Sequence, residues 1–166
     1  MTDFSNTLFA NQSVIVTGGT KGVGFGIAQA FLNAGANVFI CGRNAPELLP
    51  QGNGKSAVFI AADVRKPEES QQLIDTVLAQ TGRLDVVINN AGGSPPVKAA
   101  DAPAKLTESI IRLNLIGPLV FSQQAFQALR KNAGGGSIVN IASISGVRPS
   151  PGTAAYGAAK AGLINV

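Results

Sequence analysis

The 166-residue sequence contains no histidine, and this absence excludes several kinds of catalytic site. Ser-His-Asp and Cys-His arrangements need an imidazole as general base, so neither can be built in its standard form. A zinc site would have to rely on carboxylates and one cysteine, so no metal centre is expected. Proton transfer near neutral pH must therefore use a carboxylate, a lysine or a tyrosine with a shifted pKa.

Cysteine and charged residues are also scarce. Cys41 is the single cysteine, so no internal disulfide can form, and its apolar surroundings predict a buried strand residue. The cytoplasm is the expected compartment for such a chain. Charged residues make up 13% of the sequence, and the basic ones are scattered despite the net charge of +4. Because nucleic-acid surfaces need clustered basic residues, no nucleic-acid partner is expected.

Long apolar runs are absent as well. No run approaches the roughly 18 residues that a membrane span requires, so no membrane partner is expected. No basic residue precedes Lys21, which argues against a signal peptide at the N-terminus.

Short apolar runs separated by longer helix-like stretches fill most of the chain. The runs predict five strands, at 13–17, 37–41, 56–61, 84–88 and 137–142. The stretches between them predict helices at 23–34, 67–81, 103–130 and from 153 onward. Strands that are apolar on both faces and alternate with helices are typical of a doubly wound α/β domain with a parallel sheet. We expect one such domain over residues 1–166.

A glycine-rich turn, TGGTKGVG at residues 17–24, joins the first predicted strand to the first helix. Gly18 is expected to permit a tight turn and Gly22 a close approach to a pyrophosphate. Gly24 and Gly26 are expected to let the helix pack against the sheet. A turn without any ligand is the alternative interpretation, but the position after the first strand favours dinucleotide binding at the helix N-terminus. The expected contacts are Gly18, Thr20, Lys21, Gly22, Val23 and Gly24.

The end of the second predicted strand bears on the choice of cofactor. This strand ends in Cys41-Gly42-Arg43, without the acidic residue that often binds the adenosine ribose of NAD. Lys21 and Arg43 can instead neutralise a 2′-phosphate, which favours NADP(H). NAD(H) stays possible, because an Arg43 that is solvated or stacked on adenine would suit it as well.

Tyr156 is the only tyrosine, and Lys160 follows it by four residues on a predicted helix. This spacing puts the two side chains on one helix face, with Cβ atoms about 5–6 Å apart. A nearby ammonium favours the phenolate and lowers the pKa of a tyrosine from its usual value of about 10. Tyr156 would then donate a proton to a carbonyl oxygen as hydride arrives. A surface tyrosine with an ordinary neighbour is the alternative, since the pair alone is common by chance.

Four motifs follow one another in a fixed order. They are the glycine-rich turn, Asn89-Asn90-Ala91-Gly92, Ser143 and Tyr156-x-x-x-Lys160. Together they closely resemble the short-chain dehydrogenase/reductase family, over nearly the whole chain from about Gln12 to Val166. The resemblance implies a Rossmann-like fold and an NAD(P)-dependent oxidoreductase that transfers hydride between the cofactor and a carbonyl or secondary alcohol.

The resemblance also implies roles for single residues. Tyr156 matches the catalytic acid/base, and Lys160 matches the lysine that lowers the tyrosine pKa and binds the nicotinamide ribose. Ser143 matches the serine that binds the substrate oxygen, whereas Ser145 has the wrong spacing. Further matches are cofactor contacts: Asp63 and Val64 at the adenine, and Asn90, Ala91 and Gly92 beside the adenosine ribose. For Asn89 and Asn90, a purely turn-forming role is the alternative.

Asn114 matches the fourth catalytic residue of the family, which takes part in a proton relay through water. Pro118 has no N–H to donate to the carbonyl of Asn114, so the long predicted helix should kink there and free that carbonyl. Asn114 also falls in the otherwise apolar row Ile110, Asn114, Gly117 and Phe121. The alternative is a buried asparagine that only patches the kink.

The chain stops within the helix that follows Tyr156, whereas members of the family usually continue. We therefore expect a sheet that is incomplete at its C-terminal edge, with exposed apolar surface and an unpaired strand. A non-catalytic nucleotide-binding fragment or interaction module is the alternative function, and a methyltransferase on the same scaffold ranks last because it does not explain Ser143, Tyr156 and Lys160.

The substrate is less well specified. The loops 93–102 and 146–152 are rich in proline, glycine and alanine and predict a largely apolar substrate surface. The sequence resembles the 3-oxoacyl-thioester reductases within the family. That resemblance also implies a homo-oligomer, a dimer or tetramer packed through the helices at 103–130 and from 153 onward.

Overall fold

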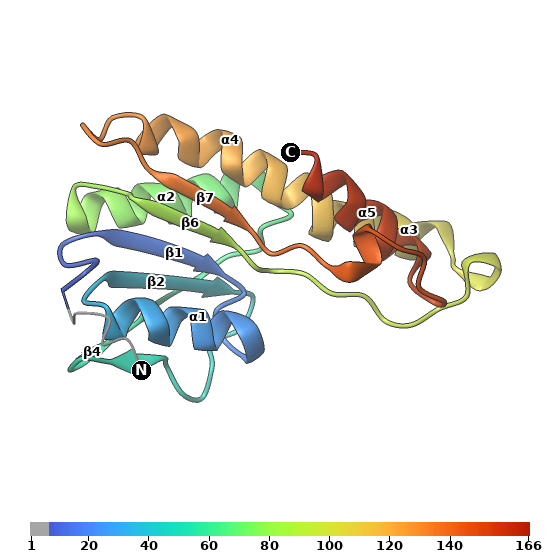
Figure 1. Cartoon of the computed structure of the whole chain (residues 1–166), viewed down its shortest axis with the longest axis horizontal. Helices are drawn as coiled ribbons and strands as arrows, with labels where there is room; N and C mark the ends of the chain where they lie inside the picture. Colours follow the sequence, from blue (N-terminus) through green and yellow to red (C-terminus); the bar gives the residue numbers. More distant parts are fainter. Residues whose placement is uncertain (1–6) are drawn as a thin grey trace.

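Five parallel strands form the central sheet of the computed structural model, which describes residues 7–166 (Figure 1). Their bounds are β1 Ser13–Thr17, β2 Asn37–Gly42, β5 Val58–Ala61, β6 Val86–Asn89 and β7 Ser137–Asn140. They lie in the order β5-β2-β1-β6-β7, and each strand is parallel to its neighbours. The chain thus runs outward from β1 to one side and then from β6 to the other, which confirms the doubly wound, Rossmann-like fold. The expectation about a signal peptide concerns in part residues 1–6, which lie outside the described residues.

Helices cover both faces of this sheet. Their bounds are α1 Gly22–Asn33, α2 Pro67–Thr81, α3 Ala104–Ile111, α4 Gly117–Leu129 and α5 Ala154–Ile164. Helix α1 packs on one face, while α2 and α4 pack on the other (Figure 1). Helices α3 and α5 lie beyond the carboxyl ends of β6 and β7, packed against each other.

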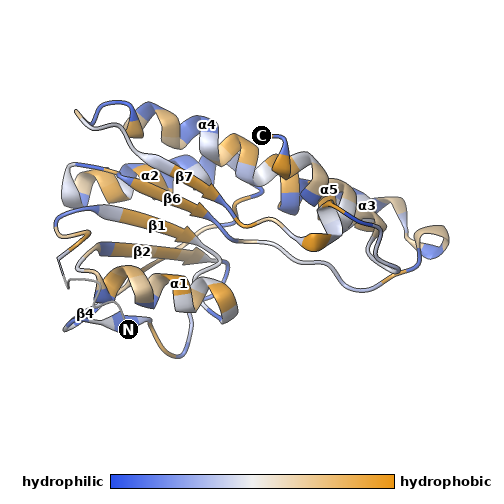
Figure 2. Ribbon diagram, in the orientation of Figure 1, coloured by the Kyte–Doolittle hydropathy of each residue, from blue (hydrophilic) through white to orange (hydrophobic). Residues whose placement is uncertain are grey.

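Alternate side chains of one strand enter the two separate cores. Val14 and Val16 pack with Leu32 of α1, whereas Ile15 between them packs with Phe121 of α4. Figure 2 shows the resulting apolar colouring along the central strands. Burial on both faces explains why this strand has no polar alternation in the sequence.

Helix α2 begins and ends as the sequence predicts. Pro67 occupies its first turn, where the missing N–H costs nothing, and Glu68 and Glu69 interact favourably with the helix dipole there. Gly82 follows the helix with a φ of 73°, in the left-handed conformation that glycine adopts without a steric penalty.

The helix predicted over 103–130 is not continuous. A π-helical turn, η2 at Arg112–Ile116, separates α3 from α4. The Gly117 N–H donates to the carbonyl of Arg112, five residues back, and Pro118 follows directly. The interruption lies where Pro118 removes a backbone donor, but its form is a π-turn rather than a simple kink.

Several strand boundaries also differ from the prediction. The third strand starts at Val58 instead of 56, because β4 (Lys55–Ser56) pairs with β3 (Gln51–Gly52) in a separate hairpin. The turn of this hairpin is Asn53-Gly54, with positive φ angles of 50° and 71°. The fourth strand covers 86–89 rather than 84–88, and the last ends at 140 rather than 142.

Strand β7 forms one edge of the sheet, and its apolar residues are only partly covered. Ile138 and Val139 expose 36% and 43% of their surface, in contrast to the buried residues of β1. The expected incomplete edge at β7 is therefore present. Within the described residues, no helix combines the length and the apolar character that crossing a membrane would require.

Candidate functional site

A cleft of about 1020 Å³ lies at the carboxyl ends of the strands. It crosses the sheet at the point between β1 and β6 where the strand order reverses, which is the usual ligand position in such folds. Most of the residues predicted to contact a dinucleotide line it, namely Gly18, Thr20, Lys21, Gly22, Val23, Gly24, Arg43, Asp63, Val64, Asn90, Ala91 and Gly92. We call the part formed by residues 41–48, from the end of β2 onward, and residues 62–65, after β5, the base end.

The glycine-rich turn leaves the first turn of α1 open toward this cleft. Gly18 and Gly22 have positive φ angles of 64° and 57°, so both need the left-handed conformation. Lys21 precedes the helix without a side-chain hydrogen bond to it, so no side chain caps the first N–H groups. An anionic pyrophosphate would fit this terminus, where N–H groups and the helix dipole both favour negative charge.

Two glycines of α1 that the sequence treats alike have different surroundings. A Cβ atom added to Gly24 would lie 2.4 Å from Nδ2 of Asn90 and 2.6 Å from the Gly18 carbonyl oxygen. Gly26 is exposed, and an added Cβ would meet no atom within 4 Å. The prediction that Gly24 permits close packing is confirmed, whereas the same prediction for Gly26 is wrong.

Thr17 joins the segment after β6 to the glycine-rich turn, a role that the sequence analysis missed. Its hydroxyl accepts the N–H groups of Asn90 and Ala91, both at 3.0 Å, and donates to the Ile88 carbonyl. The Asn90 amide donates back to the carbonyls of Thr17 and Gly18 at 2.9 and 3.2 Å. These bonds fix the floor of the cleft. The threonine at the end of the first predicted strand was the available signal.

Asn89 serves the sheet rather than a turn. It is the last residue of β6, and its amide donates to Oδ1 of Asn140 on β7 at 2.8 Å and to the Ser122 hydroxyl on α4 at 2.9 Å. Asn89 therefore cross-links two strands and a helix directly behind the cleft.

Helix α5 places Tyr156 and Lys160 on the same face. The Lys160 ammonium lies 5.8 Å from the centroid of the Tyr156 ring. Tyr156 is half-buried, whereas Lys160 exposes only 3% of its surface and donates a 2.6 Å hydrogen bond to the Ile141 carbonyl. Burial lowers the pKa of Lys160, because desolvation disfavours its charged form.

Lys160 and Asn114 meet at Gly92 on the wall of the cleft. A Cβ atom added to Gly92 would lie 2.7 Å from Oδ1 of Asn114 and 3.5 Å from the Lys160 nitrogen. Asn114 is fully buried: its Oδ1 accepts the Gly93 N–H, and its amide donates to the carbonyls of Gly93 and Ile110. The side chain of Asn114 thus ties the π-turn to the segment that lines the cleft.

Ser143 lies just before a short 3-10 turn, η3 at Ile144–Gly146, that packs against α5. Its hydroxyl accepts the Ser145 N–H at 3.2 Å. Two glycines permit the close packing, and neither was singled out from the sequence. A Cβ atom on Gly157 would lie 2.8 Å from the Ser145 carbonyl oxygen, and one on Gly146 would lie 2.7 Å from the backbone of Lys160.

The base end and the adjoining glycine-rich turn carry charged residues of both signs. Lys21 and Arg43 are exposed and line the cleft, as does Glu47. The Asp63 carboxylate accepts hydrogen bonds from Arg65, and these hold its pKa below the usual range. Arg65 was not predicted to be part of the site.

The two loops expected to form a substrate surface contact each other. The Val97 N–H donates to the Gly152 carbonyl at 2.9 Å and so connects the loop 93–102 to the loop 146–152. With α3 and the start of α5 they enclose a cavity of about 200 Å³, whose lining includes Ala155, the neighbour of Tyr156.

The sheet order and the glycine-rich turn after β1 define a Rossmann-type fold. Comparison with protein families then places the chain within this class. The model of the short chain dehydrogenase family matches residues 12–166, and the chain belongs to this family of oxidoreductases, whose members bind nicotinamide cofactors.

Individual relatives agree with this assignment. The chain is 38% identical to the 3-oxoacyl-acyl-carrier-protein reductase FabG of Chlamydia muridarum, over 96% of this chain and 66% of the relative. It is 37% identical to L-fucose dehydrogenase of Oryctolagus cuniculus, over 86% of this chain and 50% of the relative. The chain thus spans half to two thirds of the length of these curated relatives.

Solved structures show the same fold. The citronellol catabolism dehydrogenase AtuB of Pseudomonas aeruginosa PAO1 superimposes with a TM-score of 0.86 at 33% identity, over 98% of this chain and 68% of that chain. A short chain dehydrogenase from Mycobacterium smegmatis gives a TM-score of 0.87 at 28% identity, over 97% of this chain and 70% of that one.

Proposed function

We propose that the protein transfers hydride between NADP(H) and a carbonyl or secondary alcohol, with Tyr156 as the acid/base. One observation carries this proposal: the buried Lys160 ammonium lies beside the Tyr156 ring and also against Gly92 in the wall of the cleft. The side chain of Lys160 therefore connects Tyr156, the proposed proton donor, with the cleft that is proposed to bind the nucleotide.

The residues of the cleft suit the parts of a dinucleotide. The uncapped start of α1 would hold the pyrophosphate, and Asn90, Ala91 and Gly92 would lie along a ribose. Lys21 and Arg43 would neutralise a 2′-phosphate, which supports NADP(H), while NAD(H) is the second choice because Glu47 lines the same region. When bound, the cofactor would supply or accept the hydride.

The remaining chemistry belongs to side chains of the protein. In reduction the Tyr156 hydroxyl donates its proton to the carbonyl oxygen of the substrate, and in oxidation the phenolate takes a proton from the alcohol. Lys160 would bind the nicotinamide ribose of the cofactor. Ser143 would donate a hydrogen bond to the substrate oxygen, and Asn114 would hold the π-turn and the Gly93 backbone in place.

The substrate and the assembly are parts of the same proposal. A 3-oxoacyl thioester is favoured by the similarity to the reductase of Chlamydia muridarum. Ile144 and Val147 beside Ser143 expose 60% and 66% of their surface and would suit an apolar acyl chain. A homo-oligomer packed through the region of α3, α4 and α5 stays a prediction, as does the cytoplasmic location.

Replacing Tyr156 with phenylalanine tests the mechanism. The Tyr156→Phe variant should bind NADPH as the wild type does, because the ring stays in place. Its rate of 3-oxoacyl thioester reduction should fall by about 10²–10⁴-fold, because the proton donor is missing. Fluorescence titration measures binding, and NADPH absorbance measures turnover. Unchanged turnover would remove Tyr156 from the mechanism.

A non-catalytic nucleotide-binding module is the second candidate, because the lining of the cleft contains residues that suit a dinucleotide but not Ser143, Tyr156 or Lys160. A wild-type chain that binds NADPH but reduces none of a panel of ketones and 3-oxoacyl thioesters would favour this candidate.

A further inference from the structure

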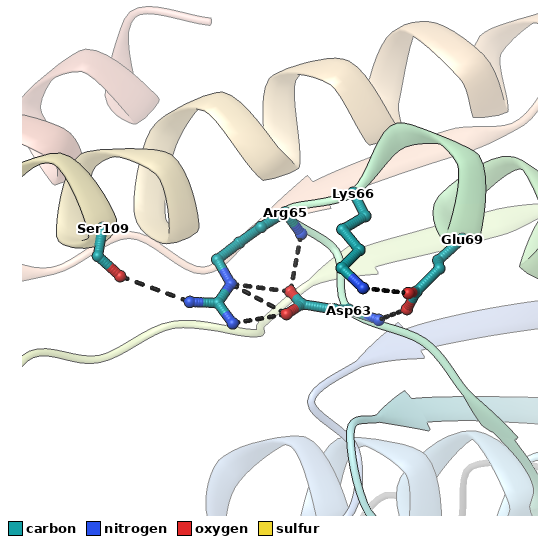
Figure 3. Close-up of polar contacts among 5 residues, drawn as sticks. All are labelled: Asp63, Arg65, Lys66, Glu69 and Ser109. Carbon is teal, nitrogen blue, oxygen red and sulfur yellow. Dashed lines mark hydrogen bonds and ion pairs between the residues drawn. The ribbon is translucent and has the colours of Figure 1, made fainter.

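Charged side chains form a network in the turn between β5 and α2, at the base end of the cleft (Figure 3). Oδ1 of Asp63 accepts hydrogen bonds from the Arg65 backbone N–H at 3.0 Å and from its Nε at 2.9 Å. The Asp63 N–H donates to Glu69 at 2.7 Å, and Glu69 pairs with Lys66 at 2.7 Å. Asp63 is therefore held through both its backbone and its carboxylate.

Arg65 is in turn held by a second element. Its Nη1 donates to the Ser109 hydroxyl on α3 at 3.4 Å, while its Nη2 pairs with Oδ2 of Asp63 at 2.5 Å (Figure 3). The guanidinium thus lies between the turn after β5 and the helix that leads into the π-turn with Asn114.

The bonds from Arg65 use most of the acceptor capacity of the Asp63 carboxylate. A carboxylate offers about four lone-pair sites. Both sites of Oδ1 are used by Arg65, and Oδ2 receives Nη2 together with a longer 3.1 Å contact to the shared Nε. One acceptor site is left on Oδ2, and Asp63 lines the cleft. A single hydrogen-bond donor on a bound base, such as an exocyclic amine, would match it.

We propose that Arg65 is a positioning residue for base recognition: by holding the Asp63 carboxylate and resting on Ser109, it directs the one remaining acceptor toward an exocyclic amine in the cleft. This inference rests on the proposed binding of a dinucleotide and gives Arg65 a part in selecting adenine. The planar guanidinium matters, because the ammonium of a lysine cannot hold both carboxylate oxygens in one fixed geometry.

Titration calorimetry with two dinucleotides tests the inference. NADP⁺ carries the exocyclic amine of adenine, and nicotinamide hypoxanthine dinucleotide phosphate has a carbonyl oxygen in its place. The wild type should bind NADP⁺ about tenfold more tightly, because a carboxylate accepts from an amine but repels a carbonyl. In Arg65→Met this ratio should fall toward one, mainly through weaker NADP⁺ binding. Arg65→Lys should give an intermediate ratio.

Lys66→Met is the matched control, because it removes the neighbouring positive charge and an exposed ion pair with Glu69. Exposed ion pairs contribute little to stability, so the ratio of the two dinucleotide affinities should stay at its wild-type value. Circular dichroism and thermal unfolding check that each variant folds. If Arg65→Met weakens both dinucleotides equally, Arg65 only supports the loop and the inference is overturned.

The pH dependence of the ratio separates positioning from simple loop support. The charged groups that face Asp63 are Arg65 and Arg43, with Glu69 at its backbone N–H and Lys66 beyond it. The buried Cys41 thiol is a neutral group near Asp63, and the Ser109 hydroxyl contacts Arg65. Because Arg65 keeps the pKa of Asp63 low, the wild-type preference for NADP⁺ should persist at acidic pH, and in Arg65→Met it should disappear at a higher pH. The same midpoint in both proteins would overturn the inference.

The failure of the proposed function is distinguishable from the failure of this inference. A wild type that binds neither dinucleotide would overturn both. A wild type that prefers NADP⁺, together with an Arg65→Met variant that keeps the full preference, would overturn only the role of Arg65.

Discussion

At the scale of single residues, Lys160 combines a functional position with a cost in stability. Its ammonium is buried and donates a hydrogen bond to the Ile141 carbonyl, and none of the ion pairs within residues 7–166 includes it. A buried charge without an ionic partner destabilises the folded state. We expect Lys160→Met to unfold at higher urea concentration, with a free energy of unfolding raised by about 1 kcal/mol, while catalysis is lost.

The sign of the pH dependence follows from the lowered pKa of Lys160. The unfolded chain binds a proton more tightly than the folded one, so wild-type stability should rise as pH increases from the folded pKa of Lys160 toward its unfolded value of about 10.4. The advantage of Lys160→Met should shrink over the same range. The exposed Lys98→Met serves as the control, and a less stable Lys160→Met variant would contradict the argument.

Cys41 is expected to be chemically inert in the folded protein. Burial raises the pKa of its thiol to about 12, so almost no thiolate is present at neutral pH. A disulfide reagent added at pH 8 should react much more slowly with the native chain than with the chain in urea. Because Cys41 is the only cysteine, the released chromophore reports on this one site. Fast labelling of the native chain would show that the end of β2 opens readily.

At the scale of elements, α1 offers a matched pair of glycine substitutions. Gly24→Ala should destabilise the protein and weaken NADPH binding, because its methyl group would displace the Asn90 amide from the cleft floor. Gly26→Ala meets open space in the same helix and should stabilise the protein by about 0.5–1 kcal/mol, since alanine favours a helix. Thermal unfolding and NADPH titration of both variants check this. Equal effects of the two substitutions would contradict the packing argument.

The elements that could be predicted from the sequence are those with strong local signals. Helix α2 has its proline at one end and a glycine at the other, and β1 is a continuous apolar run between polar residues. The hairpin of β3 and β4 also carried a signal, because Asn53-Gly54 favours a tight hairpin turn. It was missed because the neighbouring residues are polar and the strands have only two residues each.

Other features depend on contacts between distant segments and have no local signal. The different surroundings of Gly24 and Gly26 arise because only one of them faces Asn90. The π-turn could be placed near Pro118, but its form depends on how Gly117 approaches the Val64 carbonyl, where an added Cβ would lie 2.9 Å away. The link from Arg65 to Ser109 spans 44 residues and needs α3 in its final place.

At the scale of the whole molecule, the candidate site is assembled from both halves of the sheet. The cleft follows from the rule that parallel strands gather their carboxyl ends at one edge, which places the glycine-rich turn and Arg43 in it. Its residues Asp63, Val64, Asn90, Ala91 and Gly92 were predicted from the family resemblance. Tyr156 and Lys160, which adjoin the cleft, come from α5, beyond the carboxyl ends of β6 and β7. Gly92 lies between the cleft and Lys160. It was predicted as a cofactor contact but not as the residue where Lys160 and Asn114 come together.

Tyr156 is the single tyrosine of a chain without tryptophan, and it is half-buried next to Lys160. The near-ultraviolet absorbance and emission of the phenol therefore come from the proposed reacting group alone. An alkaline titration followed by the spectral change of phenolate would measure the ionisation of Tyr156 without a label and without a substrate. The absorbance of Tyr156 thus reports directly on the proton that the proposed chemistry transfers.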